Sequence, residues 1–222
     1  MAKIIIDIET VGFDFDSFDE KSQAYLLKYA ENEEEKEEIK NKLALYPLTG
    51  EIVTIGMLNP ETNKGYALFQ NNHGEAERFE ENGVIFESGS EKEILEKFWN
   101  FVSNYQQAIT FNGRGFDLPF LMLRSALYKI QPTKNFMGYR YDYKTHCDLL
   151  EQLTFYGATR KFNLDFYAKS FGIKSSKEEG VDGSMVGEMY GAGKFLEIAK
   201  YCVRDLLTTK ELYEYWDKYL RF

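Results

Sequence analysis

The segment KIIIDIETVG, residues 3–12, is the feature that most restricts what this chain can form. Its three consecutive isoleucines are β-branched and predict a strand that enters a hydrophobic core. The strand continues through Asp7 and Glu9, whose side chains point to the same face roughly 6–7 Å apart, because side chains alternate along a strand. Two carboxylates at that separation repel by about 2–3 kcal/mol at an effective dielectric of about 20. We therefore expect another group to compensate for their charge.

Periodicity and turn signals predict one α/β domain over residues 1–222, with 44% hydrophobic residues to build its core. NPETN is the expected turn of a hairpin, and Ser90 with Glu93 is a capping box at the start of a helix. The predicted strands are 3–10, 50–58, 64–69, 83–88 and 107–113, and the predicted helices are 90–105, 116–129, 148–156, 163–171 and about 193–220, with a loop at 172–184.

A charged segment separates the first strand from the hairpin. Apolar and aromatic residues recur at roughly helical spacing in residues 19–45 among many acids. We therefore expect one or two surface helices inserted after the first strand, over about residues 17–47. The run ENEEEKEE within it is typical of a solvated helix face.

The composition limits the classes of protein that remain. The net charge of −9 argues against broad nonspecific binding to nucleic acid, although clustered carboxylates can still meet a phosphodiester through divalent cations. Two histidines are too few for most histidine-rich metal sites, and Cys147 and Cys202 are predicted to be buried thiols. No membrane span or N-terminal signal is recognisable, so we expect a cytoplasmic protein with no membrane partner.

Two later segments add acids to those of the first strand. Asp117 follows the glycine-rich turn FNGRGF, where a buried strand passes into a helix, and aspartate is also a preferred helix N-cap. Tyr201 and Asp205, in YCVRD, are four residues apart on a predicted helix and so share one face. Taken singly, each feature has a structural explanation: a surface pair at a sheet edge for Asp7 and Glu9, an N-cap, and an exposed polar pair.

In this order, DIET, FNGRGFDLPFL and YCVRD resemble the three exonuclease motifs of the DEDD superfamily, whose members have a ribonuclease H-like fold. Tyrosine stands four residues before the last acid and Lys200, rather than histidine, stands five before it, so the resemblance is to the tyrosine (DEDDy) branch. The chain is similar to the proofreading exonuclease domain of family B DNA polymerases and to stand-alone predicted 3′–5′ exonucleases related to it. Further similarity lies in THCDLL (145–150), LDFYAKSFGI (164–173) and EEGVDGSMVGEMY (178–190).

The resemblance implies a mixed central sheet flanked by helices and a site for two divalent cations, Mg²⁺ or Mn²⁺. Its metal ligands would be Asp7, Glu9, Asp117 and Asp205, whose four negative charges balance two such cations. Asp7 would bridge both cations. Glu9 and Asp205 would complete the site that activates water, and Asp117 would hold the second cation largely through water.

Tyr201 would be the fifth catalytic residue, by orienting the nucleophilic water. A tyrosine with a pKa of about 10 is a poor general base at neutral pH, so the metal must lower the pKa of the water. Thr10, Asn112 and Phe116 would line the pocket for the terminal nucleotide, and Phe116 would stack on a base. Asn112 can equally satisfy turn backbone, and a phenylalanine beside a turn can equally belong to the core.

We therefore expect a metal-dependent 3′–5′ exonuclease that hydrolyses phosphodiester bonds at the 3′ ends of single-stranded nucleic acid, DNA in preference to RNA, and releases nucleoside 5′-monophosphates. A catalytically silent nucleic-acid-binding scaffold, an RNA exonuclease and an endonuclease of the same fold stay open as alternatives. Of the other candidate residues, Asp148 is expected to be a structural or capping acid and Asp182 a turn former. His146 is expected to be a packing or hydrogen-bonding residue.

Overall fold

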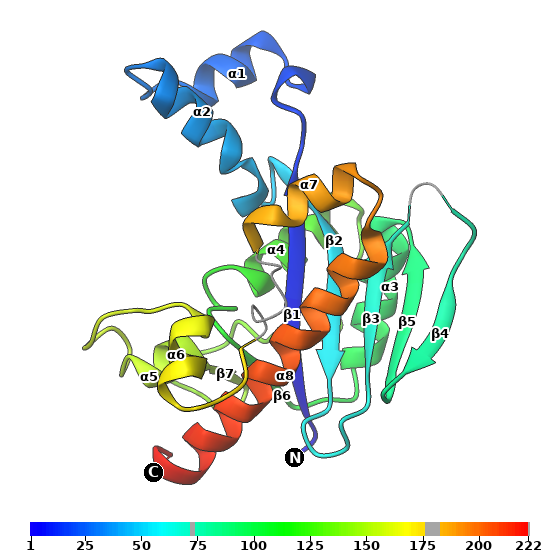
Figure 1. Cartoon of the computed structure of the whole chain (residues 1–222), viewed down its shortest axis with the longest axis vertical. Coiled ribbons are helices and arrows are strands. Elements are labelled where there is room, and N and C mark those ends of the chain that lie inside the picture. The colour runs from blue at the N-terminus through cyan, green and yellow to red at the C-terminus, as the bar shows by residue number, and fades with distance from the viewer. Residues whose placement is uncertain (72–73, 176–182, 222) are drawn as a thin grey trace.

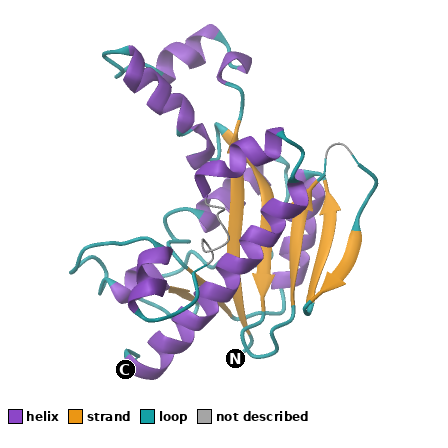
Figure 2. Ribbon diagram, viewed as in Figure 1, coloured by secondary structure: helices purple, strands orange, loops and turns teal. Residues whose placement is uncertain are grey.

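The computed structural model describes residues 1–71, 74–175 and 183–221, and these residues form a mixed seven-stranded sheet with helices on both faces (Figures 1 and 2). The strands follow the order β4-β5-β3-β2-β1-β6-β7 across the sheet. Their bounds are β1 (Lys3–Gly12), β2 (Gly50–Leu58), β3 (Gly65–Gln70), β4 (Arg78–Glu81), β5 (Val84–Gly89), β6 (Gln107–Thr110) and β7 (His146–Asp148). β1 pairs antiparallel with β2 and parallel with β6, so the first strand of the chain lies inside the sheet.

Helices form a layer on each face of the sheet, and the first two α-helices of the chain lie apart from it. The bounds of the helices are α1 (Glu20–Leu26), α2 (Glu33–Asn41), α3 (Glu91–Val102), α4 (Asp117–Leu127), α5 (Leu149–Leu153), α6 (Leu164–Ser170), α7 (Val186–Gly191) and α8 (Phe195–Tyr219). α8 crosses one face over β1, β2 and β3, while α3 and α4 cover the opposite face (Figure 1). This arrangement confirms the predicted α/β class and agrees with a ribonuclease H-like sheet. Within the described residues, no helix combines the length and the apolar character that crossing a membrane requires.

The side chains of β1 alternate between the two layers. Ile4 and Ile6 belong to the core under α3 and α4, whereas Ile5 belongs to the core under α8. Asp7 and Glu9 have the same parity as Ile5 and therefore face α8. The buried isoleucines fix the strand in the core, so they also fix the direction in which both carboxylates point.

One alternative for the acids of β1 is wrong. Asp7 and Glu9 are not a surface pair, because Asp7 is half-buried, Glu9 is buried and both face the layer of α8. β1 continues past them to Gly12, although it pairs with β6 only over Lys3–Ile5. Pairing with β2 continues past the acids through a register shift between Glu9 and Thr10. A surface acidic pair at a sheet edge is thereby excluded.

Most of the predicted elements are confirmed. β2 has the expected bounds, 50–58, and α3 begins with the reciprocal capping box, in which Glu93 Oε2 accepts from the Ser90 N–H at 2.8 Å. β4, β7 and α7 were not predicted. β4 contains a single apolar residue, β7 has three residues and α7 has six, which is too short for hydrophobic periodicity to be visible. The assignment of residues 1–222 to one domain stays a prediction.

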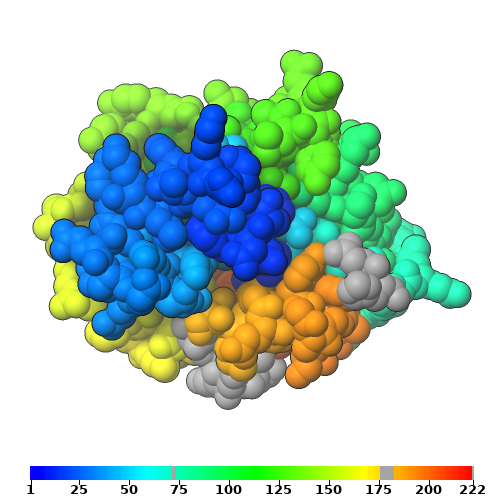
Figure 3. Space-filling model, turned by 90° about the horizontal axis from the view of Figure 1, so that it is seen from above, coloured from blue at the N-terminus to red at the C-terminus, as the bar shows by residue number. Residues whose placement is uncertain are grey.

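The insertion after β1 contains two helices, α1 and α2, and extends away from the sheet (Figure 1). Seen from above, the insertion occupies the front of this face, in blue (Figure 3). Glutamates on α2 form surface ion pairs with lysines three or four residues away, for example Lys36 with Glu33 at 2.6 Å. These pairs are those of a solvated helix face, as the acidic run predicts.

Candidate active site

The two acids of β1 form the centre of the candidate site. Asp7 is half-buried, Glu9 is buried, and one carboxylate oxygen of each lies within 4.8 Å of the other and of Cys202 Sγ. Asp7 lies opposite Gly56 of β2 in the sheet. Both carboxylates thus project from β1 into the layer that α8 occupies.

Asp117 reaches the same place from the start of α4. Its Oδ1 accepts a hydrogen bond from the backbone N–H of Ile8 at 3.1 Å, and the side chain is buried. The alternative role of N-cap is wrong, because Phe116 is the N-cap and Asp117 is the first helical residue. A buried ion pair at 2.6 Å between Arg124 and Glu91 holds α4 against α3. The carboxylate of Asp117 is therefore fixed beside β1 rather than used to cap its own helix.

α8 supplies Tyr201, Cys202 and Asp205, which are all buried on the side that faces β1. The close approach of α8 to the sheet depends on Gly56, since a Cβ at that position would lie 2.6 Å from Cys202 Sγ. Because α8 packs this closely on β2, the Cys202 thiol donates a hydrogen bond to Asp7 Oδ2 at 3.3 Å. The structure therefore brings three distant segments to one point over the middle of the sheet.

The four carboxylates form one electrostatic unit. Burial, followed by the charges of Asp205 and Asp117, raises the pKa of both Asp7 and Glu9 well above the usual range. Burial, together with the charges of Asp148 and Asp205, raises the pKa of Asp117 to about 7. Each of these carboxylates is easier to protonate than in water, because like charges are crowded in a poorly solvated site. A divalent cation would remove that repulsion.

Tyr201 stands at the edge of this unit. Burial and the nearby charges of Asp205 and Glu9 raise its pKa above the ordinary value, and hydrogen bonding to Asp205 acts in the same direction. The guanidinium carbon of Arg204 lies 5.7 Å from the centroid of the Tyr201 ring. The phenol is therefore held in its protonated form next to the acids.

The three residues expected at the terminal nucleotide differ in their contacts. The Thr10 hydroxyl donates to the carbonyl of Ala44, at the base of the insertion, at 2.7 Å. Asn112 is exposed on the glycine-rich turn in the left-handed region, at φ 63°. Phe116 is half-buried, and its ring centroid lies 5.5 Å from that of Phe120.

Asp148 and His146 have structural roles, as expected. Asp148 caps α5 through the N–H of Leu150, and it also accepts from the N–H groups of Asn112 and Arg114 at 3.0 and 2.9 Å. His146 Nε2 lies 2.8 Å from the Thr110 hydroxyl, and burial, followed by the Arg114 charge, lowers the pKa of the imidazole to about 3. Asp148 thus fixes the turn that leads to α4. Asp182 lies outside the described residues.

Sequence reasoning missed two residues of the site. Cys202 is buried as predicted, but it touches Asp7 rather than only filling the core. Its position three residues before Asp205 puts both on one helix face, and this spacing was the available signal. A glycine inside a strand such as Gly56 marks a close approach of another segment, and this was the second signal.

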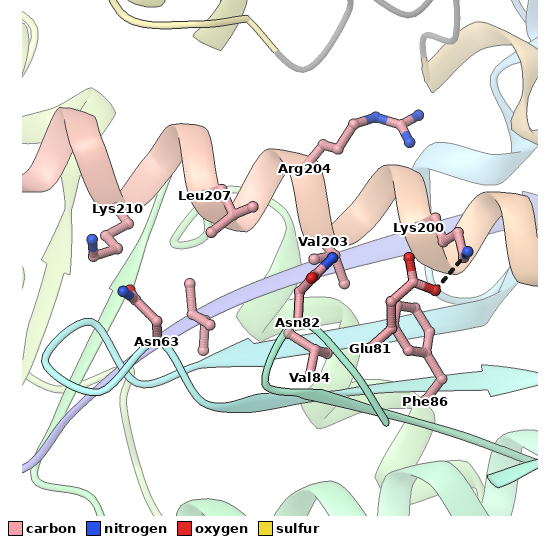
Figure 4. A pocket seen from close by; sticks show the side chains of 11 residues that line it. Asn63, Glu81, Asn82, Val84, Phe86, Lys200, Val203, Arg204, Leu207 and Lys210 are labelled. Carbon is pink, nitrogen blue, oxygen red and sulfur yellow. Dashed lines mark ion pairs between the residues drawn. The ribbon is translucent and has the colours of Figure 1, made fainter. Parts of the chain in front are cut away.

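A cavity of about 580 Å³ lies on the other flank of α8 (Figure 4). Leu58, Val84 and Phe86 line it from the sheet side, and α8 contributes residues such as Lys200 and Lys210. Glu81, which also lines the cavity, forms an ion pair with Lys200 at 2.7 Å. Among the described residues that line the cavity there is therefore no cluster of acids for a cation, and the cavity shares no lining residue with the acids of β1.

A mixed sheet flanked by helices, with acids gathered at β1, defines a protein of the ribonuclease H-like fold class. The family model of predicted 3′–5′ exonucleases related to the exonuclease domain of PolB matches residues 67–220, and the chain belongs to this family. The matched range includes Asp117, Tyr201 and Asp205, whereas Asp7 and Glu9 precede it. A search of curated proteins finds no match.

Proposed function

We propose that the protein is a divalent-metal-dependent 3′–5′ exonuclease that acts on single-stranded nucleic acid, DNA in preference to RNA, and releases nucleoside 5′-monophosphates. The observation that carries this proposal is the convergence of acids from β1, α4 and α8 beside a buried tyrosine, in a chain of this exonuclease family. A catalytically silent scaffold has no evident use for buried like charges that destabilise its own fold.

The donor set of the site fits hard divalent cations. Asp7, Glu9, Asp117 and Asp205 supply carboxylate oxygens, and their charge balances two Mg²⁺ or Mn²⁺ ions. Asp7, Glu9 and Asp205 would hold the cation next to the attacking water, and Asp7 and Asp117 would hold the other cation. When bound, the cations supply the charge stabilisation that the attacking and leaving oxygens require.

The neighbouring side chains act on the water and on the substrate. Tyr201 keeps its proton at neutral pH, so its hydroxyl orients the water by a hydrogen bond and does not remove a proton. His146 is a poor substitute base, because its ring is bonded to Thr110 and burial lowers its pKa to about 3. Asn112 and Phe116, on the turn beside Asp117, and Thr10, on β1, are assigned to the terminal nucleotide.

Digestion of matched, uniformly labelled single-stranded DNA and RNA oligonucleotides, with Mg²⁺ or Mn²⁺, tests the proposal. We expect mononucleotides from the first time points, faster digestion of DNA, and a loss of rate on the order of 100-fold in Asp205→Asn. Glu34→Gln, on the exposed face of α2, is the matched control and should keep the wild-type rate.

Other outcomes would replace parts of the proposal. Internal fragments at early times would identify an endonuclease, and faster digestion of RNA would change the substrate. Equal rates for wild type and a folded Asp205→Asn variant would reject catalysis at this site. Calorimetric titration with Mn²⁺ provides an independent measurement, since a silent scaffold predicts no binding that depends on the carboxylates.

A further inference from the structure

Three tyrosine rings gather on the surface beside α5. Tyr139 and Tyr141, on the loop between α4 and β7, are 73% and 53% exposed, and their ring centroids lie 5.5 Å apart. The Tyr141 ring lies 4.6 Å from that of Tyr156, which follows α5 in the chain. These three residues, the tyrosine cluster, come from two separate segments, and Tyr156 is partly buried beside the exposed ring of Tyr141. Exposed aromatic surface of this kind is typical of a binding site.

The tyrosine cluster is fixed in place and connected to the candidate active site. Arg140, between the two exposed tyrosines, is paired with Glu151 of α5 at 2.6 Å. Glu151 also faces Arg114 of the glycine-rich turn at 3.5 Å, and Arg114 donates to the Gly138 carbonyl at 3.3 Å. Tyr156 is held in the left-handed region at φ 58°, a conformation that costs energy for a bulky residue. The loop with the tyrosines and the turn that leads to Asp117 are therefore one connected unit.

The charge around the tyrosine cluster is opposite to that of the chain as a whole. Residues 128–175 contain eight Lys and Arg against four Asp and Glu, in a chain with a net charge of −9. Exposed cations near the cluster in sequence are Lys144, Arg160 and Lys161. In Figure 1 this segment, with α5 and α6, forms the flank of the molecule beside β7. The acidic insertion extends away from this flank, from the C-terminal end of β1. A polyanion would be attracted to the flank and repelled by the insertion.

We infer that the tyrosine cluster binds the single-stranded nucleic acid that precedes the 3′-terminal nucleotide, with bases stacked on its rings and phosphates beside its cations. The inference rests on the proposed function, which places the 3′ end of the strand at the acids of β1. Stacking on tyrosine is tolerant of sequence because every base has a π-face, and it commonly occurs together with cations that follow the backbone. Rings and cations together favour a nucleic acid over an apolar protein partner.

Fluorescence anisotropy with 5′-labelled dT12 in EDTA, where no hydrolysis occurs, tests the tyrosine cluster. We expect Tyr139→Ala/Tyr141→Ala to weaken binding by about tenfold to hundredfold, which is the range for lost base stacking. The matched control is Tyr25→Ala/Tyr29→Ala, which removes two tyrosines that are 76% and 81% exposed on the insertion, and it should leave the affinity unchanged. Tyr141→Phe keeps the ring and should also bind as the wild type does.

The outcomes separate this inference from the proposed function. Binding of dT12 that is equal in wild type and Tyr139→Ala/Tyr141→Ala overturns the inference and leaves the surface to a protein partner. An equal loss in the control variant also overturns it. If the wild type binds dT12 through the tyrosines but does not digest it with Mn²⁺, the inference stands and the proposed function fails. If the wild type digests dT12 with Mn²⁺ but Tyr139→Ala/Tyr141→Ala binds it as tightly as the wild type does, the proposed function stands and the inference fails.

Discussion

Replacing Asp117 by asparagine should stabilise the metal-free protein at alkaline pH. Asparagine keeps an acceptor for the Ile8 N–H, which donates to Asp117 Oδ1 at 3.1 Å, but it removes one negative charge from the buried cluster. The substitution therefore separates the electrostatic cost of the carboxylate from its hydrogen bond. Loss of a metal ligand and a gain in stability are expected from the same change.

The magnitude follows from the pKa of Asp117, which is about 7 in the folded protein, compared with about 3.9 in an unfolded chain. Each pH unit corresponds to about 1.4 kcal/mol, so the ionised carboxylate destabilises the fold by about 4 kcal/mol above pH 7. The folded protein binds this proton more tightly than the unfolded chain does. Wild-type stability therefore declines as the pH rises from about 4 to about 7, and it is least affected below about pH 4.

Urea unfolding in EDTA at several pH values measures this effect. Asp117→Asn should exceed the wild type by up to about 4 kcal/mol at pH 8 and by about 1.5 kcal/mol at pH 5. Saturating Mn²⁺ should stabilise the wild type much more than the variant and so reduce or reverse the difference. Glu34→Gln should show no such dependence on pH. A variant no more stable than the wild type at pH 8 in EDTA would refute the argument from charge repulsion.

Three further substitutions test how the site is assembled. Gly56→Ala places a Cβ 2.6 Å from Cys202 Sγ, so α8 must shift; urea unfolding should show a loss of about 1–3 kcal/mol, and nuclease assays a drop in kcat. Tyr201→Phe should lower kcat by about tenfold to hundredfold, the kinetic equivalent of a hydrogen bond of about 1.5–3 kcal/mol, while calorimetry shows an unchanged affinity for Mn²⁺. Asp148→Ala leaves the N–H groups of Asn112 and Arg114 without their acceptor. The loss of these two part-buried hydrogen bonds should cost about 1–3 kcal/mol each in urea unfolding and impair digestion more than Mn²⁺ binding. Wild-type behaviour in any of the three would show that the contact in question does not position the site.

Much of the fold could be predicted because many helix and strand boundaries depend on interactions between residues that are close together in the sequence. β2 matches its predicted range because its apolar run is bounded by turn residues at both ends, and α3 begins at Ser90 because the capping box involves residues only three apart. β4 and β7 escaped prediction because each is stabilised mainly by pairing at an edge of the sheet, where the partner strand supplies the hydrogen bonds. A strand of three or four residues has too few side chains to show a period.

The sequence by itself determined that Asp7 and Glu9 share a face, and that Tyr201 and Asp205 share another, because strand and helix periods follow from backbone geometry alone. It could not show that the Asp117 side chain contacts β1. That contact depends on the backbone N–H of Ile8, which lies 109 residues earlier in the chain. The pairing of β1 with β6 ends at Ile5, so this N–H is free to donate to Asp117. The contact of Cys202 with Asp7 likewise depends on how closely α8 packs on a strand without a side chain at position 56. Such contacts were decided by tertiary structure, because only the packed sheet determines which distant segments meet and at what distance.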